Sequence, residues 1–179
     1  MEKIQVQTFK SPVGELILGS YQEQLCLCDW TFRKMRKTVD ARVQKGLNST
    51  FESEKSRVIE QTIRQLEEYF DQKRKVFDIP LLWIGSEFQR LVWGKLLEIP
   101  FGETRSYGAL ARELGNPDAI RAVATANGAN ALSILIPCHR VIGSDGSLVG
   151  YAGGLEAKKK LLRLEDAQLL ANNDQLSMF

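Results

Sequence analysis

A cysteine and a histidine stand side by side at Cys138 and His139, and this histidine is the only one in the chain. A thiol must lose its proton before it can attack carbon, and an imidazole that accepts this proton, directly or through a water, makes sulfur a nucleophile. The imidazole in turn needs a carboxylate that fixes its tautomer and stabilises its charge. The pair indicates nucleophilic chemistry at sulfur, but a free cysteine after an apolar run is most often a small core residue.

The surrounding segment shows how such a pair could be positioned. Ile134-Leu135-Ile136 is an apolar run that leads into Cys138 and His139, and a loop rich in glycine follows from 143 to 154. Adjacent residues of a strand point to opposite faces. The sequence therefore does not show how the two side chains meet.

Two short helices precede this segment. One is predicted from Ser106 to Leu114, where Gly115 ends it, and Asp118 to Asn127 continues in a second helical pattern. Helices joined by so short a turn are a candidate helix-turn-helix motif.

The second of these helices has an unusual outward face. At 100° per residue its predicted buried side consists of Ile120, Val123 and Ala124. The outward side then carries Arg121, Ala122 and Thr125. A face of small residues around one arginine suits close approach to another surface, although packing within the domain fits the pattern equally well.

The N-terminal part has a different character. Residues 4 to 30 alternate between apolar and polar and predict three short antiparallel strands, and residues 54 to 73 predict one amphipathic helix. The basic stretch from 33 to 45 is predicted to be a solvated loop rather than a DNA contact. Residues 76 to 85 read as extended, which places a domain boundary near Gly85.

Composition limits the class of protein. The 24 basic and 22 acidic residues give a net charge of only +2, so any contact with nucleic acid depends on local placement of charge. No segment approaches the roughly 20 apolar residues that span a bilayer, and the N-terminus lacks a signal-like apolar run. We expect a cytoplasmic protein, or a nuclear one in a eukaryote, without disulfides.

The longest motif in the chain is IPCHRVIGSDGSLVGYAGG, preceded by RAVATANGAN. It resembles the O6-alkylguanine-DNA alkyltransferases, also called methylated-DNA–protein-cysteine methyltransferases. The resemblance extends through SEFQRLVWGKLLEIPFGETRSYGALARELG and KKKLLRLE and covers residues 86 to 165. The family implies DNA repair, in which an alkyl group passes from a flipped guanine to the protein in one irreversible turnover.

The resemblance also implies catalytic roles. Cys138 would be the alkyl acceptor, His139 its water-mediated base and Glu165 the carboxylate that orients the imidazole. Tyr107 would assist base rotation and donate a proton toward the leaving guanine. No cofactor is implied, because the damaged base is itself the alkyl donor.

Other positions correspond to residues that bind DNA or line the pocket. Arg121 would fill the base stack after the nucleotide leaves it, and Ala122 and Thr125 would let the helix approach the minor groove. The residues that would shape the alkylguanine pocket are Asn130, Tyr151, Ala152 and Gly153. The partner would be double-stranded DNA that contains O6-alkylguanine, bound by a monomer without contact to a membrane.

The implied fold is an α/β ribonuclease-H-like domain at residues 1–85, with a three-stranded antiparallel sheet and a helix. A mostly α, winged-helix-like domain with the helix-turn-helix would occupy 86–166, followed by a polar tail at 167–179. Some relatives hold zinc in the first domain, but Cys26 and Cys28 are its only cysteines and it has no histidine. We therefore expect no metal site.

Two alternatives remain open. A non-catalytic, lesion-binding or regulatory protein would use the same DNA surface without chemistry at Cys138. A cysteine hydrolase with a Cys-His-Glu triad would turn over many times on a small ester or amide.

Overall fold

The structure is a computed structural model, and it describes residues 2–165 of the chain, which divide into two units. The first unit contains the residues up to Ser86 together with Ala131–Leu135, and the second contains Glu87–Asn130 and the residues from Ile136 onward. The predicted polar tail at 167–179 lies outside the described residues. The short segment Ala131–Leu135, which leads into Cys138, thus belongs to the first unit.

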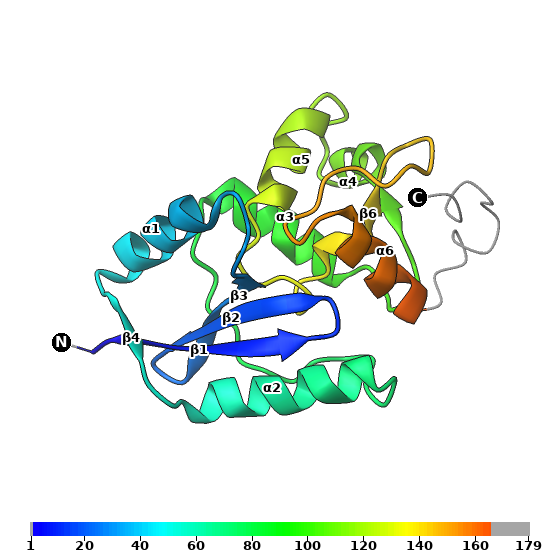
Figure 1. Ribbon diagram of the computed structural model, residues 1–179. Helices are drawn as coiled ribbons and strands as arrows, with labels where there is room; N and C mark the ends of the chain where they lie inside the picture. Colours follow the sequence, from blue (N-terminus) through cyan, green and yellow to red (C-terminus); the bar gives the residue numbers. More distant parts are fainter. Residues whose placement is uncertain (1, 166–179) are drawn as a thin grey trace. The chain divides into compact units, whose positions relative to one another are not determined.

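The first unit is built on a four-stranded sheet in the order β3-β2-β1-β4 (Figure 1). The strands β1 (Ile4–Ser11), β2 (Gly14–Tyr21) and β3 (Gln24–Trp30) pair antiparallel, which confirms the three strands predicted from alternation. The prediction of a three-stranded sheet is nevertheless wrong, because β4 (Phe51–Ser53) adds to β1 in parallel. Three residues are too short a stretch to show an alternating pattern.

The helix α2 (Arg57–Phe70) packs against the three long strands and runs along one face of the sheet (Figure 1). Its Ile59 and Leu66 are fully buried, as the amphipathic pattern predicts. The helix is shorter than the predicted range of 54–73. It begins after Ser56, whose hydroxyl accepts a hydrogen bond from the Ile59 amide and so caps the first turn.

The basic stretch is not the predicted loop. Most of it forms α1 (Arg36–Leu47), in which Val39 and Val43 are buried one turn apart. They pack into a core cluster with Ile4 and Cys26. Two valines at a spacing of four residues are enough to anchor a helix whose other face is charged.

Two arginines of this stretch, Arg33 and Arg36, form ion pairs with a buried aspartate, Asp29. The Asp29 side chain is fully buried, and its Oδ2 accepts from Arg33 Nη1 at 2.8 Å and from Arg36 Nη1 at 2.9 Å. Arg36 also donates through Nε to Asp40 Oδ1 at 2.8 Å. These arginines therefore stabilise the first unit from within.

Backbone pairing attaches the segment Ala131–Leu135 to β3. The Cys28 amide donates to Ala131 O and the Ser133 amide donates to Cys28 O, each at 2.8 Å. Leu132 thereby forms an isolated parallel bridge with Cys28. The chain that approaches Cys138 is thus fixed by the edge of the sheet.

The second unit is mainly helical. Within it, α5 packs against both α3 and α4, and Trp93 of α3 donates its indole N–H to Ala126 O at 2.8 Å. Two short strands, β5 and β6, pair in parallel. Its elements are α3 (Glu87–Leu97), β5 (Arg105–Ser106), α4 (Tyr107–Glu113), α5 (Ile120–Gly128), the 3₁₀ helix η1 (Cys138–Arg140), β6 (Val141–Ile142) and α6 (Leu155–Leu164).

The faces of α5 differ in part from the prediction. Val123 is buried, and Arg121, Ala122 and Thr125 are exposed, as predicted, whereas Ala124 is only partly buried. Ile120 is wrongly predicted to be buried, since 44% of its surface is exposed. It begins the helix, where the chain has just left an exposed turn.

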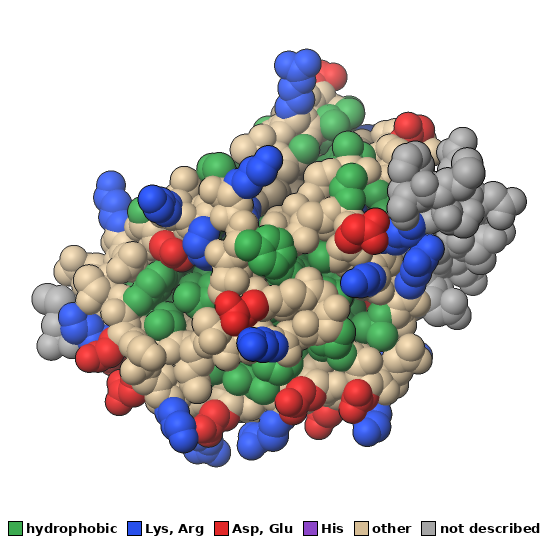
Figure 2. All heavy atoms as spheres, viewed as in Figure 1, with side chains coloured by type: hydrophobic (Ala, Val, Ile, Leu, Met, Phe, Trp, Pro, Cys, Tyr) green, Lys and Arg blue, Asp and Glu red, His purple; other side chains and the backbone are tan. Residues whose placement is uncertain are grey.

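Charges of both signs are interspersed on the face of the protein shown in Figure 2. This distribution agrees with the small net charge of +2. Within residues 2–165, none of the helices has the length and apolar character needed to cross a membrane.

Replacing Asp29 with alanine is expected to lower the free energy of unfolding by roughly 3 kcal/mol, because two arginine side chains lose their shared buried partner. Urea titration followed by circular dichroism measures this loss. The matched control is Glu98→Ala, which removes an exposed ion pair with Lys95 and should change stability by less than about 0.5 kcal/mol. Similar losses in the two variants would contradict a structural role for the Asp29 cluster.

Candidate active site

The cysteine and histidine lie on a single turn of 3₁₀ helix. Pro137 precedes η1, the Cys138 amide donates to Ile136 O at 2.8 Å, and the chain returns to an extended conformation at Val141. Because a 3₁₀ helix has about three residues per turn, neighbouring side chains are not forced to opposite faces as in a strand. The pair thus lies on a helical turn, where the alternation expected for a strand does not apply.

Burial is the second property of this turn. Only 3% of the Cys138 surface is exposed, and His139 is completely buried. The turn packs against α3 and α6. A thiol and an imidazole in such surroundings interact with little screening by solvent.

The carboxylate that His139 needs comes from the end of α6. Glu165 is the C-cap residue of this helix, and its Oε1 lies 2.8 Å from His139 Nε2. A neutral imidazole that donates from Nε2 carries its lone pair on Nδ1. That Nδ1 is buried and accepts no hydrogen bond from residues 2–165, so it is available to a proton.

Burial and charge set the protonation states of this pair. Burial lowers the pKa of His139 and outweighs the opposite effect of Glu165, while Arg140 and Lys158 lower it further. Burial alone would raise the pKa of Glu165, but His139 and Arg140 together hold it well below its usual value. At neutral pH the site thus contains a neutral imidazole beside an ionised carboxylate.

Three further predicted residues lie around this turn. The ring of Tyr151 is 6.4 Å from the His139 ring, edge to face. The Tyr107 hydroxyl, at the start of α4, lies 3.4 Å from Val149 O, and burial followed by the charge of Cys138 raises its pKa. Asn130 Nδ2 donates to Ile136 O at 2.9 Å and so connects the residues after α5 to the cysteine segment.

The remaining predicted residues lie elsewhere in the second unit. Ala152 is partly buried and Gly153 is buried, in the loop before α6. Arg121, Ala122 and Thr125 lie on the exposed face of α5, where the Thr125 hydroxyl donates to Arg121 O at 2.9 Å.

Two basic residues of the site were missed by sequence reasoning. Arg140 forms a bidentate pair with Glu165. Lys158 is fully buried and donates through Nζ to Val149 O and Gly150 O at 3.1 and 3.3 Å, and burial lowers its pKa to about 8. A run of three lysines resembles a solvated surface, and only its position on the helical face shared with Leu161 and Leu162 indicates burial.

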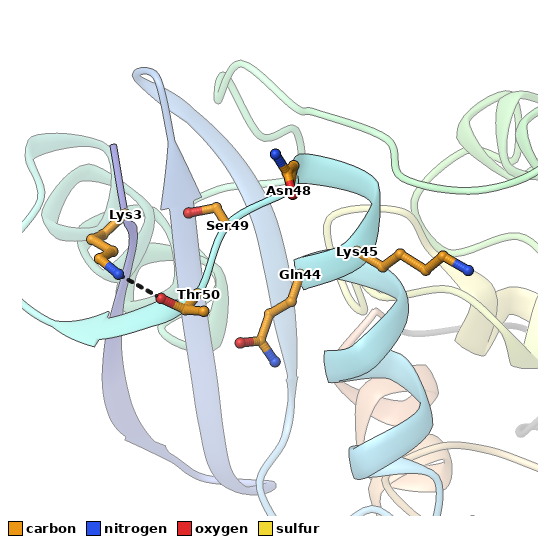
Figure 3. A pocket seen from close by; sticks show the side chains of 6 residues that line it. All are labelled: Lys3, Gln44, Lys45, Asn48, Ser49 and Thr50. Carbon is orange, nitrogen blue, oxygen red and sulfur yellow. Dashed lines mark hydrogen bonds between the residues drawn. The ribbon is translucent and has the colours of Figure 1, made fainter. Parts of the chain in front are cut away.

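A hollow on the first unit contains none of these groups (Figure 3). The ammonium group of Lys3 donates to Thr50 Oγ1 at 2.8 Å at its edge. The lining residues are Lys3, Gln44, Lys45, Asn48, Ser49 and Thr50. None of them is placed to act as an activated nucleophile.

Metal ligation has no candidate in the part of the chain that the structure describes. Residues 2–165 contain no group of three histidine, cysteine or acidic side chains that could hold an ion. Cys26 and Cys28 are buried and form no disulfide within the described residues, and burial raises the pKa of Cys26 to about 12. A thiol of that kind is inert.

Sequence comparison assigns both parts of the chain. The profile of the 6-O-methylguanine DNA methyltransferase ribonuclease-like domain matches residues 4–83, and that of the DNA binding domain of the same proteins matches residues 87–167. A methylated-DNA–protein-cysteine methyltransferase of Methanosarcina acetivorans is 45% identical over 157 residues, which cover 88% of this chain and 95% of that protein. The chain belongs to this methyltransferase family.

Other family members agree. The methylated-DNA–protein-cysteine methyltransferase of Mycobacterium leprae is 41% identical over 172 residues, or 94% of this chain and 96% of that protein. The crystal structure of Mycobacterium tuberculosis OGT in complex with DNA superimposes with a TM-score of 0.78 at 38% identity, covering 92% of this chain and 94% of that one. The methyltransferase from Pyrococcus kodakaraensis, at 23% identity and a TM-score of 0.68, shares the fold. The family resemblance expected from the motif is thus confirmed.

The single histidine allows a direct test of the electrostatics. We expect the ring signals of His139 to titrate below the ordinary value of 6.5, because burial disfavours the charged imidazole. The folded state then binds this proton less readily than the unfolded chain, so stability is lost as the pH falls below 6.5. Proton NMR of the ring gives the midpoint, and urea titrations at several pH values give the stability.

His139→Gln is the control, and it should lack the part of the stability loss that begins near pH 6.5. A ring midpoint above 6.5 would contradict the neutral imidazole.

Proposed function

We propose that this chain repairs DNA by taking the alkyl group from O6 of an alkylated guanine onto Cys138, once and irreversibly. The observation that carries the proposal is the buried hydrogen bond of 2.8 Å between His139 and Glu165, next in sequence to the buried Cys138 on η1, in a chain of this family. Relatives that are over 40% identical across the aligned residues are named for transfer to a protein cysteine. Both the chemistry and the family point to the same atom.

The proposed reaction begins with loss of the Cys138 proton to Nδ1 of His139, directly or through a water. The thiolate attacks the alkyl carbon in line, so that a C–S bond forms as the C–O6 bond breaks. The electron pair of that bond stays with guanine, which takes a proton from the Tyr107 hydroxyl. The imidazolium proton of His139 then returns to the Tyr107 phenolate, directly or through water, so that the net proton moves from sulfur to guanine and the thioether remains on the protein.

Each polar group has a defined part in this reaction. Glu165 keeps the proton of His139 on Nε2 and stabilises the imidazolium as it forms. Tyr151, Ala152, Gly153 and Asn130 would shape the pocket for the base, whose entry requires rotation out of the duplex. Because the damaged base is the donor, no cofactor takes part.

DNA recognition is proposed for α4 and α5 as a helix-turn-helix. The exposed face of α5 offers Ala122 and Thr125, whose small side chains permit close approach to the DNA backbone, and Arg121, which can occupy the base stack. The minor groove carries little sequence information. We therefore expect recognition of damage rather than of base sequence.

The proposed reaction also suggests roles for the two domains, the oligomeric state and the cellular location. We propose residues 1–85 as a supporting domain and 86–166 as the domain that binds DNA and accepts the alkyl group. One chain supplies Cys138, His139 and Glu165, so a monomer suffices. With DNA as substrate, the protein would act in the cytoplasm of a prokaryote or the nucleus of a eukaryote.

Mixing the protein with duplex DNA that bears one radiolabelled O6-methylguanine tests the reaction. We expect label on protein to reach about one per chain and then stop, because the thioether is not hydrolysed. Cys138→Ala should transfer none, while Cys26→Ala, a change at another buried thiol, should transfer fully. Tight binding without transfer by the unmodified chain would assign it to the lesion-binding class, and repeated turnover would indicate a hydrolase-like reaction.

Replacing Arg121 with alanine should slow transfer from duplex DNA by roughly tenfold, because the side chain no longer stabilises the vacated stack. Single-turnover rates on duplex and on free O6-methylguanine base separate this effect from the chemistry, which should be unchanged. Arg90→Ala, on an exposed position of α3, is the matched control. An equal loss on the free base would place Arg121 in the chemical step instead.

A further inference from the structure

Arg140 follows the reactive pair on η1, and its guanidinium is surrounded by acceptors. Nε donates to Glu165 Oε2 at 2.8 Å, Nη2 donates to Glu165 Oε1 at 2.9 Å, and Nη1 donates to Ile99 O at 2.7 Å. The group also lies 5.8 Å from the centre of the Phe101 ring. Since only 7% of its surface is exposed, these contacts hold it in one position.

The Glu165 carboxylate is consequently hydrogen-bonded by two residues, His139 and Arg140. Its Oε1 accepts from both His139 and Arg140, and its Oε2 also accepts from Arg140. The planar fork of a guanidinium matches both oxygens of a carboxylate, so it fixes the rotation of that group as well as its place. His139 Nε2 thus meets an oxygen whose direction Arg140 sets.

The turn after α3 supports this arrangement. Besides Ile99 O and the Phe101 ring, it contains Gly102 with φ of 81°, where a Cβ atom would come within 2.9 Å of Glu165 O. A side chain there would push on the backbone of the carboxylate residue. The turn therefore packs closely against both Arg140 and Glu165.

The same contacts influence the protonation of His139. The charged groups that act on His139 are Glu165, which favours its protonation, and Arg140 and Lys158, which oppose it. Without Arg140, the buried His139–Glu165 pair would keep an extra proton to higher pH, on either the ring or the carboxylate. Over that range of pH, a pair that already holds the extra proton cannot accept the one from Cys138.

We propose that Arg140 is a positioning residue for alkyl transfer, which holds the Glu165 carboxylate so that His139 donates from Nε2 and offers Nδ1 to Cys138. This inference rests on the proposed function, because it concerns the base of that reaction. Arg140 acts through Glu165 and His139 and needs no contact with the alkylated base.

The test compares the unmodified full-length chain with Arg140→Met and Arg140→Lys. Single-turnover rates of methyl transfer from saturating O6-methylguanine duplex are measured across pH. For Arg140→Met we expect a rate at least tenfold lower at neutral pH, and an acid limb of the pH profile displaced upward by about one unit. Transfer still ends near one methyl per chain, since Cys138 is intact.

Arg140→Lys separates charge from geometry and serves if the methionine variant does not fold. Lysine keeps the positive charge and loses the two-pronged contact. We expect its acid limb near that of the unmodified chain and a rate between the other two. Arg90→Met, a change at an exposed arginine, should react as the unmodified chain does.

The outcomes are distinguishable. If the unmodified chain transfers methyl and both Arg140 variants keep its rate and its acid limb, the positioning role is overturned while the function stands. A lower rate with an unmoved acid limb in Arg140→Met also overturns it, because loss of structure alone would then explain the defect. Absence of transfer by the unmodified chain would refute the function itself.

Discussion

A carboxylate buried to 98% cannot remain ionised without partners, and the partners of Glu165 define the site. One side of it faces His139, whose ring is thereby fixed with its proton on Nε2. The other side faces Arg140, which compensates the charge. The three residues come from one turn of 3₁₀ helix and the end of α6, so the packing of η1 on α6 assembles the machinery.

The first unit contributes through the backbone. Residues Ala131–Leu135 extend the edge of the sheet at β3 before the chain turns into η1. The Asn130 side chain holds Ile136 O on the other side of this segment. The segment that leads to Cys138 is thus hydrogen-bonded at both ends, which gives this buried thiol a defined position.

Sequence alone predicted the elements that repeat at short range. The three strands and α2 follow from alternation and helical spacing, which local residues determine. α1 escaped prediction because two valines among many charges form a weak pattern, and β4 because three residues form none. Arg33 and Arg36 pair with the buried Asp29 from only four and seven residues away, but this pairing leaves no periodic signal in the sequence.

The residues of the site were likewise predicted only in part, because their contacts join distant parts of the sequence. Cys138 and His139 attract attention as neighbours, whereas Glu165 resembles a surface charge at a helix end until the family motif is considered. Glu165 and His139 lie 26 residues apart in the sequence. The contact of Arg140 with Glu165 is likewise seen only once the fold has brought α6 and η1 together. Lys158 was missed because a run of three consecutive lysines predicts an exposed surface, whereas Lys158 is buried.

The central claim is that an ionised Glu165 makes His139 an effective base for Cys138. Its most direct test is the single-turnover rate of methyl transfer by Glu165→Gln, in a variant shown to be folded and to bind O6-methylguanine duplex with unchanged affinity. We predict a rate about a hundredfold lower at neutral pH, because the amide cannot stabilise the imidazolium. A rate equal to that of the unmodified chain would contradict the claim and leave Cys138 to be activated by other groups.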